Sequence, residues 1–161
     1  KYGYDGTNVA MSIAVKTEDN KIFVEAIDCQ PIRNGNDWIL HFLRNADIHT
    51  VVVDGANGQK ILEDAMKLAK LKPPILPTVK EFIVANSMFE QALFQRTIVH
   101  RSQPSLFQVV TNCEKRPIGT QGGFGYRSQI EDYDIALMDS MILAHWACAE
   151  AKETKKQKIR Y

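Results

Sequence analysis

Apolar and polar residues alternate in two stretches near the start of the chain. The first stretch is 9–15, the second is 22–27, and the polar segment 18–20 lies between them. Strict alternation is typical of strands that bury one face, and a short polar segment between two such strands is typical of a turn. We therefore predict an antiparallel β-hairpin over these residues.

The unbroken apolar run 51–53 predicts a different kind of strand. A short run without alternation indicates a strand that is covered on both faces in the middle of a sheet. The run leads directly into Asp54 and Gly55. A carboxylate that ends a buried strand is costly to desolvate, and ligands bind at this edge of an open α/β sheet. Asp54 is therefore a candidate functional residue, and the alternative is an aspartate that only starts a turn.

Apolar residues at helical spacing predict the remaining elements. We expect a short edge strand at 97–100 and helices at about 38–43, 61–69, 80–95, 105–112 and 133–151. The glycine-rich segment after residue 112 indicates a flexible or hairpin-like region. Because helices that connect strands favour parallel pairing, we predict an α/β fold whose sheet mixes parallel and antiparallel strands.

Composition narrows the possible functions only slightly. Of the 161 residues, 45% are hydrophobic and 24% are charged, and a formal net charge of +1 neither indicates nor excludes a nucleic-acid partner. The three cysteines are widely spaced, so the sequence indicates neither a disulfide framework nor a CxxC metal site. We expect a reducing intracellular compartment. No apolar stretch has the length of a membrane span.

Three aspartates in separate segments have an order that points to a metal site. Asp5 precedes the first strand, Asp54 ends the buried run, and Asp134 opens the last predicted helix. Carboxylates from such distant segments can lie close together if they share hard divalent cations such as Mg²⁺ or Mn²⁺, because these ions prefer oxygen ligands. Two such ions about 4 Å apart activate water and stabilise the leaving oxygen of a phosphodiester. The pattern therefore indicates phosphodiester hydrolysis.

The third carboxylate has two other candidates. Asp139 lies on the same predicted helix as Asp134, roughly 140° away around the helix axis, so the two cannot both face one small site. Asp132 is the other candidate, and Asp134 itself is placed where it would cap the helix. His100 is an auxiliary candidate that would orient water or a phosphate, and the simpler interpretation is a structural histidine.

Basic residues gather in the glycine-rich segment. Lys115, Arg116 and Arg127 are interleaved there with Phe124 and Tyr126. Such residues contact a phosphate backbone without reading its sequence, and the alternative is a mobile, solvated loop. A second basic group, at 152–161, is expected to be a solvated tail.

Over nearly its whole length the sequence resembles the C-terminal nuclease domain of the terminase large subunit of tailed bacteriophages, a DNA-packaging motor. The resemblance rests on five motifs and on their order. They are KYGYDG at 1–6 leading into VAMSIAV at 9–15, VVVDGANG at 51–58, HRSQP at 100–104, RPIG at 116–119, and DIAL at 134–137 running to LAHW at 143–146.

The resemblance implies an RNase H-like fold, in which a central mixed β-sheet of about five or more strands is flanked by α-helices. It also implies a single nuclease domain over residues 1–161. In the family an ATPase motor domain precedes this nuclease domain, so we expect the chain to be a fragment of a larger protein. The chain contains no Walker A pattern.

The implied activity is that of an endonuclease that uses two Mg²⁺ or Mn²⁺ ions to cleave double-stranded DNA concatemers during phage genome packaging. The acidic residues that bind the ions in the family correspond to Asp5, Asp54 and Asp134. The implied partners are double-stranded DNA, the ATPase domain, the portal and the small terminase subunit, in the cytoplasm of a bacterial host. The alternatives are another RNase H-like nuclease, acting on RNA hybrids or junctions, and a non-catalytic module that docks DNA or the portal.

Overall fold

The predicted hairpin lies at the centre of the fold in the computed structural model, which describes residues 1–151. Strand β1 (Asn8–Lys16) pairs antiparallel with β2 (Ile22–Pro31). The short strand β3 (Ile98–Val99) then adds to β2 in parallel. Helices lie between β2 and β3 along the chain, so the parallel pairing follows the crossover rule. The predictions of a hairpin and of a mixed sheet are confirmed.

Five α-helices are present within the described residues, and each was predicted from the sequence. Their bounds are α1 (Asp37–Asn45), α2 (Gln59–Leu68), α3 (Val79–Phe94), α4 (Pro104–Thr111) and α5 (Ala136–Glu150), with a 3₁₀ turn at Ile32–Asn34. No described helix is long and apolar enough to cross a membrane. The predicted basic tail, 152–161, lies outside the described residues.

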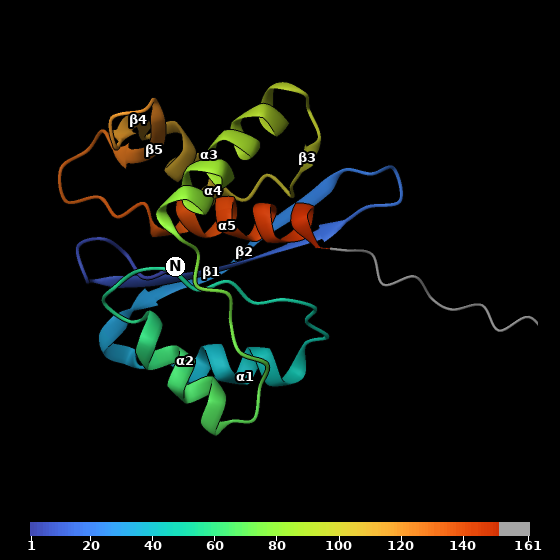
Figure 1. Cartoon of the computed structure of the whole chain (residues 1–161), viewed down its shortest axis with the longest axis vertical. Coiled ribbons are helices and arrows are strands. Elements are labelled where there is room, and N and C mark those ends of the chain that lie inside the picture. Colours follow the sequence, from blue (N-terminus) through green and yellow to red (C-terminus); the bar gives the residue numbers. More distant parts are fainter. Residues whose placement is uncertain (152–161) are drawn as a thin grey trace, which may run out of the picture.

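The helices cover the two faces of the sheet as separate layers. Helices α1 and α2 lie on one side, and α3, α4 and α5 lie on the other (Figure 1). Each side has its own hydrophobic core, because alternate residues of a strand face opposite ways. Ala10 of β1 belongs to the α5 side, whereas its neighbour Val9 packs with α1, α2 and Tyr2.

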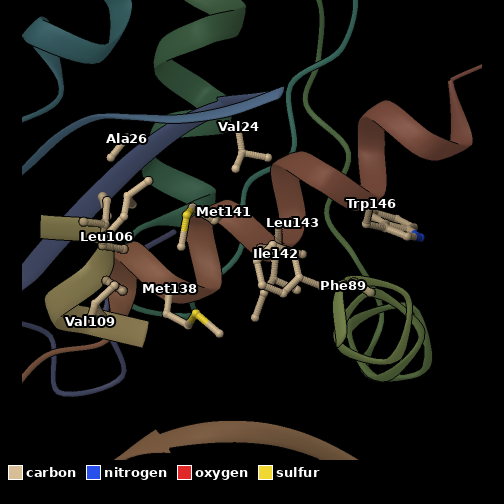
Figure 2. Packing of buried hydrophobic residues seen from close by; sticks show 14 of the residues in the cluster. Val24, Ala26, Phe89, Leu106, Val109, Met138, Met141, Ile142, Leu143 and Trp146 are labelled. Carbon is tan, nitrogen blue, oxygen red and sulfur yellow. The ribbon is translucent and has the colours of Figure 1, made fainter. Parts of the chain in front are cut away.

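Helix α5 is the most buried element. Nearly all of its residues from Ala136 to Trp146 are buried, so it is apolar on almost every side, as expected of a helix inside a core. Figure 2 shows it packed between Val24 of β2, Leu106 of α4 and Phe89 of α3. Because the helix is buried all round, the polar side chains on it are buried as well.

The strands are divided between two sheets within the described residues. Strands β4 (Cys113–Ile118) and β5 (Gly123–Ser128) form a separate antiparallel hairpin, as one of the two sequence interpretations of this segment required. The described strands therefore make a sheet of three and a sheet of two. The α/β class is confirmed.

The predicted central strand at 51–53 is not a strand of the sheet. The segment makes one parallel bridge, between Val52 and Ile75, through bonds from Val53 N to Ile75 O (2.9 Å) and from Ile75 N to Val51 O (2.8 Å). Val51 and Val52 are only half-buried, because a groove of about 520 Å³ lies between this segment, β1, α1 and α5. The apolar run does place an extended backbone there, with Asp54 at its end.

Candidate functional site

The loop that follows Val53 is built around the second residue of the chain. Tyr2 donates its backbone N–H to Asp54 O at 2.9 Å. A β-carbon on Gly55 would lie 2.6 Å from Tyr2 O, and one on Gly58 would overlap the Tyr2 ring. The glycines of this motif are therefore required by the close approach of Tyr2. This packing fixes the backbone of Asp54 against the first residues of the chain.

The first three residues lie beside β1 and point toward the start of α5. Lys1 O accepts a hydrogen bond from Ala10 N at 2.9 Å, and Tyr2 forms an antiparallel bridge with Val9. Lys1 and Gly3 share one side of this extended segment. A β-carbon on Gly3 would lie 2.7 Å from Asp134 Oδ2. Position 1 therefore faces the same region as position 3.

Lys1 joins two carboxylates that are far apart in the sequence. Its Nζ lies 2.5 Å from Asp54 Oδ2 and 3.8 Å from Asp139 Oδ2. The side chains of Lys1, Asp54 and Asp139 are only 12%, 22% and 13% exposed. The ammonium also lies 5.0 Å from the centre of the Phe82 ring, within the range of a cation–π interaction. We call Lys1, Asp54 and Asp139 the carboxylate cluster.

Asp139 is the least satisfied member of the carboxylate cluster. The residue is buried on the first turn of α5, and its Oδ1 has no hydrogen-bond partner among the described residues. Burial raises the pKa of Asp139 to about 6; the Lys1 ammonium opposes this shift, and the Asp54 charge adds to it. A buried carboxylate oxygen without a partner is costly, and either a hydrogen-bond donor or a cation would remove this cost.

Asp5 makes its hydrogen bonds within its own turn. Asp5 is exposed, and its Oδ1 accepts hydrogen bonds from Thr7 N (3.0 Å) and Thr7 Oγ1 (2.8 Å). The side chain therefore closes the local turn that leads into β1, which is a structural role that Asp-Gly pairs commonly have.

Asp134 caps α5. The residue lies two positions before the helix, and its Oδ1 accepts the Ala136 N–H at 2.7 Å. Its Oδ2 is buried without a partner among the described residues, and burial raises its pKa, with a smaller contribution from the charge of Asp5. Asp132, the other candidate, is exposed. Asp139 is thus the carboxylate of this region that meets Asp54.

The chemistry of Asp54 and Asp139 would suit a divalent cation. Among the described residues, no group of three or more histidine, cysteine, aspartate or glutamate side chains is placed to hold a metal ion. The described residues do not include Asp5, Asp54 and Asp134 as one such group, and the three-carboxylate site that the resemblance implies stays a prediction. Asp54 and Asp139 supply hard oxygen ligands, which suit an ion such as Mg²⁺ that keeps several of its water ligands. The sequence signal for Asp139 was its position as an acid inside an almost wholly apolar helix.

The three basic residues of the β4–β5 hairpin already have partners within the chain. Lys115 Nζ lies 2.7 Å from Glu90 Oε1, and Arg127 Nε lies 2.7 Å from Glu114 Oε1. Arg116 Nε donates to a backbone carbonyl, Tyr126 O, at 3.2 Å. The Arg116 charge also lowers the pKa of Asp139, against the larger effect of burial. The hairpin therefore extends a positive charge toward the carboxylate cluster.

His100 has a local structural contact. The residue is exposed beyond the end of β3, and its Nδ1 accepts the backbone N–H of Ser102 at 3.0 Å. Ser102 has a left-handed backbone, with φ of 53°, so the imidazole stabilises a strained turn. This contact favours the interpretation of His100 as a structural histidine.

Comparison with known proteins assigns the chain to no family. No protein-family model, no curated protein and no solved structure matches it. The chain's own residues define a mixed α/β fold with a lysine between two carboxylates, of which Asp139 is buried and Asp54 is half-buried. The functional argument depends on these residues.

Proposed function

We propose that this protein is a metal-dependent endonuclease that cleaves double-stranded DNA. The observation that carries the proposal is the pairing of Asp54 and Asp139 across Lys1, with Asp139 Oδ1 buried and lacking a partner among the described residues. The proposed substrate and role follow from the resemblance to terminase nuclease domains. The role is the cutting of DNA concatemers during phage genome packaging in a bacterial host.

An RNase H-like fold is part of this proposal. It is supported by the antiparallel hairpin β1–β2, by the parallel addition of β3, and by a buried helix, α5, that packs on this sheet. It is also supported by the origin of the two acids, one from the end of an extended segment and one from that helix.

Hydrolysis of a phosphodiester forms a bond from a water oxygen to phosphorus and breaks the bond from phosphorus to the leaving oxygen. The water loses a proton, and the leaving oxygen gains one. A divalent ion bound here would lower the pKa of the attacking water and stabilise the developing negative charge. Asp54 and Asp139 would hold the ion, and Lys1 would add a fixed positive charge beside it.

The β4–β5 hairpin is the proposed DNA contact. The positive charge of Arg116 lowers the pKa of Asp139. Lys115 and Arg127 lie on the same hairpin, and their side chains are 53% and 63% exposed. Contacts of this type to phosphates position DNA without selecting a sequence. We therefore expect weak sequence preference from this domain.

The direct test is cleavage of supercoiled plasmid by the purified chain with Mn²⁺, Mg²⁺ or EDTA. We expect cleavage with metal and none with EDTA. Asp54→Asn and Asp139→Asn should each reduce the rate by at least about 10²-fold, since each removes a negative ligand of the ion. Asp47→Asn changes an exposed aspartate on the loop after α1 and is the matched control, which should cleave like wild type.

Three outcomes would contradict the proposal, each in a different way. In the first, Asp139→Asn cleaves at the wild-type rate while Asp5→Asn and Asp134→Asn lose cleavage. This result would mean that Asp5 and Asp134, as the sequence resemblance implies, bind the metal in place of Asp139. Cleavage of RNA hybrids or junctions but not of duplex DNA would favour another RNase H-like nuclease. DNA binding without cleavage under any metal condition would favour a module that docks DNA or the portal.

A further inference from the structure

The ammonium group of Lys1 lies where a cation would bind between two carboxylates. It contacts Asp54 Oδ2 at 2.5 Å and lies 3.8 Å from Asp139 Oδ2. We propose that Lys1 takes the place of one ion of a two-metal site, so that Asp54 and Asp139 hold a single divalent ion beside a permanent ammonium charge. This inference rests on the proposed function and specifies how many ions the site takes.

The charges of the cluster favour one ion over two. Two carboxylates carry two negative charges, and Lys1 already neutralises one of them. A single divalent ion leaves the cluster with one net positive charge, which suits a phosphate. A second divalent ion would add two positive charges within a few ångströms of the ammonium, and like charges at such distances repel strongly.

The ligands also favour one ion. Two metal ions about 4 Å apart require several bridging and terminal oxygen ligands. Within residues 1–151 the carboxylate cluster offers Asp54 and Asp139, and no third acidic or histidine side chain joins them in a group that would hold a metal. The unpartnered Oδ1 of Asp139 is the oxygen that is free to bind an ion without displacing Lys1.

Lys1 is held in the cluster from more than one direction. Its side chain is only 12% exposed, and its ammonium faces the Phe82 ring of α3 at 5.0 Å. The aromatic face and the Asp54 carboxylate both favour a positive charge at this point. A held ammonium contributes its charge to a bound phosphate without reorganising during the reaction, which is the property that makes fixed charges effective in catalysis.

The test is the stoichiometry and affinity of Mn²⁺ binding, measured by calorimetry on the 161-residue chain without DNA. We expect one ion per wild-type chain. Lys1→Met removes the competing charge with little change in length, so we expect affinity to rise by about tenfold or more. Lys1→Asp supplies a third carboxylate, and we expect it to bind two ions. Lys21→Met removes a lysine that pairs with Asp19 at the surface and should bind like wild type.

The outcomes separate this inference from the proposed function. Two ions in the wild-type chain would overturn the inference while leaving metal-dependent cleavage intact, and this result needs no variant to fold. The inference also fails if folded Lys1→Met and Lys1→Asp both bind Mn²⁺ like wild type. If the wild-type chain binds no Mn²⁺ and its cleavage of plasmid is unaffected by EDTA, the metal-dependent function itself is wrong.

Discussion

The aromatic ring of Tyr2 packs directly against the α-carbon of Gly58, where no β-carbon would fit. The same tyrosine donates its hydroxyl to Asn36 Oδ1 at 2.7 Å and its backbone N–H to Asp54 O at 2.9 Å. Its neighbour in the chain, Lys1, contacts the Asp54 side chain. The packing of Tyr2 therefore sets the position of Lys1 relative to Asp54.

Replacing Gly58 with alanine should destabilise the protein because the added methyl group meets the Tyr2 ring. We expect a loss of about 1–3 kcal/mol in the free energy of unfolding, measured with urea. In a Tyr2→Leu background the smaller side chain leaves space, so the same substitution should cost clearly less. Equal costs in the two backgrounds would contradict the contact as the cause.

Substitutions of Asp134 distinguish two roles for this residue, which are stabilising the start of α5 and binding a metal ion. Asp134→Ala removes the acceptor of the Ala136 N–H and should lower stability by about 1 kcal/mol. Asp134→Asn keeps an acceptor oxygen, so we expect stability close to wild type. Thermal unfolding and Mn²⁺ calorimetry on both variants provide the measurement. Loss of Mn²⁺ binding in Asp134→Asn would mean that this carboxylate is a ligand.

The contribution of His145 to the stability of the protein should be lost as the pH falls below about 6.5. The imidazole is buried on α5, 5.5 Å from the Phe89 ring, and burial lowers its pKa from the ordinary value of 6.5. The unfolded chain then binds a proton at a higher pH than the folded protein does, so this stabilisation is complete above pH 6.5 and is lost as pH falls through the folded pKa. Urea unfolding between pH 7 and pH 5, roughly the range in which histidine titrates, measures the slope.

His145→Leu should remove this part of the pH dependence, since it deletes the titrating group and keeps an apolar side chain in the core. His41→Gln changes an exposed histidine of α1 and serves as the control, which should unfold with the wild-type pH dependence. If wild type and His145→Leu lose stability equally between pH 7 and pH 5, the buried imidazole is not the cause.

If the β4–β5 hairpin binds DNA as proposed, the intramolecular ion pair of Lys115 should weaken that contact. Glu90→Gln frees the Lys115 ammonium from its partner at 2.7 Å, so we expect affinity for duplex DNA to rise by roughly two- to tenfold. Lys115→Gln should lower the affinity and reduce the salt dependence by about one phosphate contact. Fluorescence anisotropy at several salt concentrations provides both values. An unchanged affinity in both variants would exclude Lys115 as a DNA contact, and Lys67→Gln, an exposed lysine of α2, is the control.

Local patterns in the sequence determined most of the elements. The alternation in 9–15 and 22–27 predicted the β1–β2 hairpin, helical spacing predicted four of the α-helices, and Pro104 predicted the start of the fifth. Helix α3 begins where Thr78 and Glu81 form a reciprocal capping box, and α4 begins at Pro104. These signals depend on residues a few positions apart, so they are readable without knowledge of the fold.

The pairing of strands and the surroundings of each carboxylate were decided only by the tertiary structure. Periodicity does not say whether an apolar run such as 51–53 will find a neighbour, and here it makes one bridge to Ile75. Asp134 and Asp139 are close in the sequence, yet Asp134 accepts the first N–H of α5 and Asp139 is buried beside Lys1. The difference depends on how α5 packs against the sheet, which is a long-range property. The sequence alone therefore determined that Asp134 and Asp139 were candidates, and burial of the helix placed Asp139 beside Lys1.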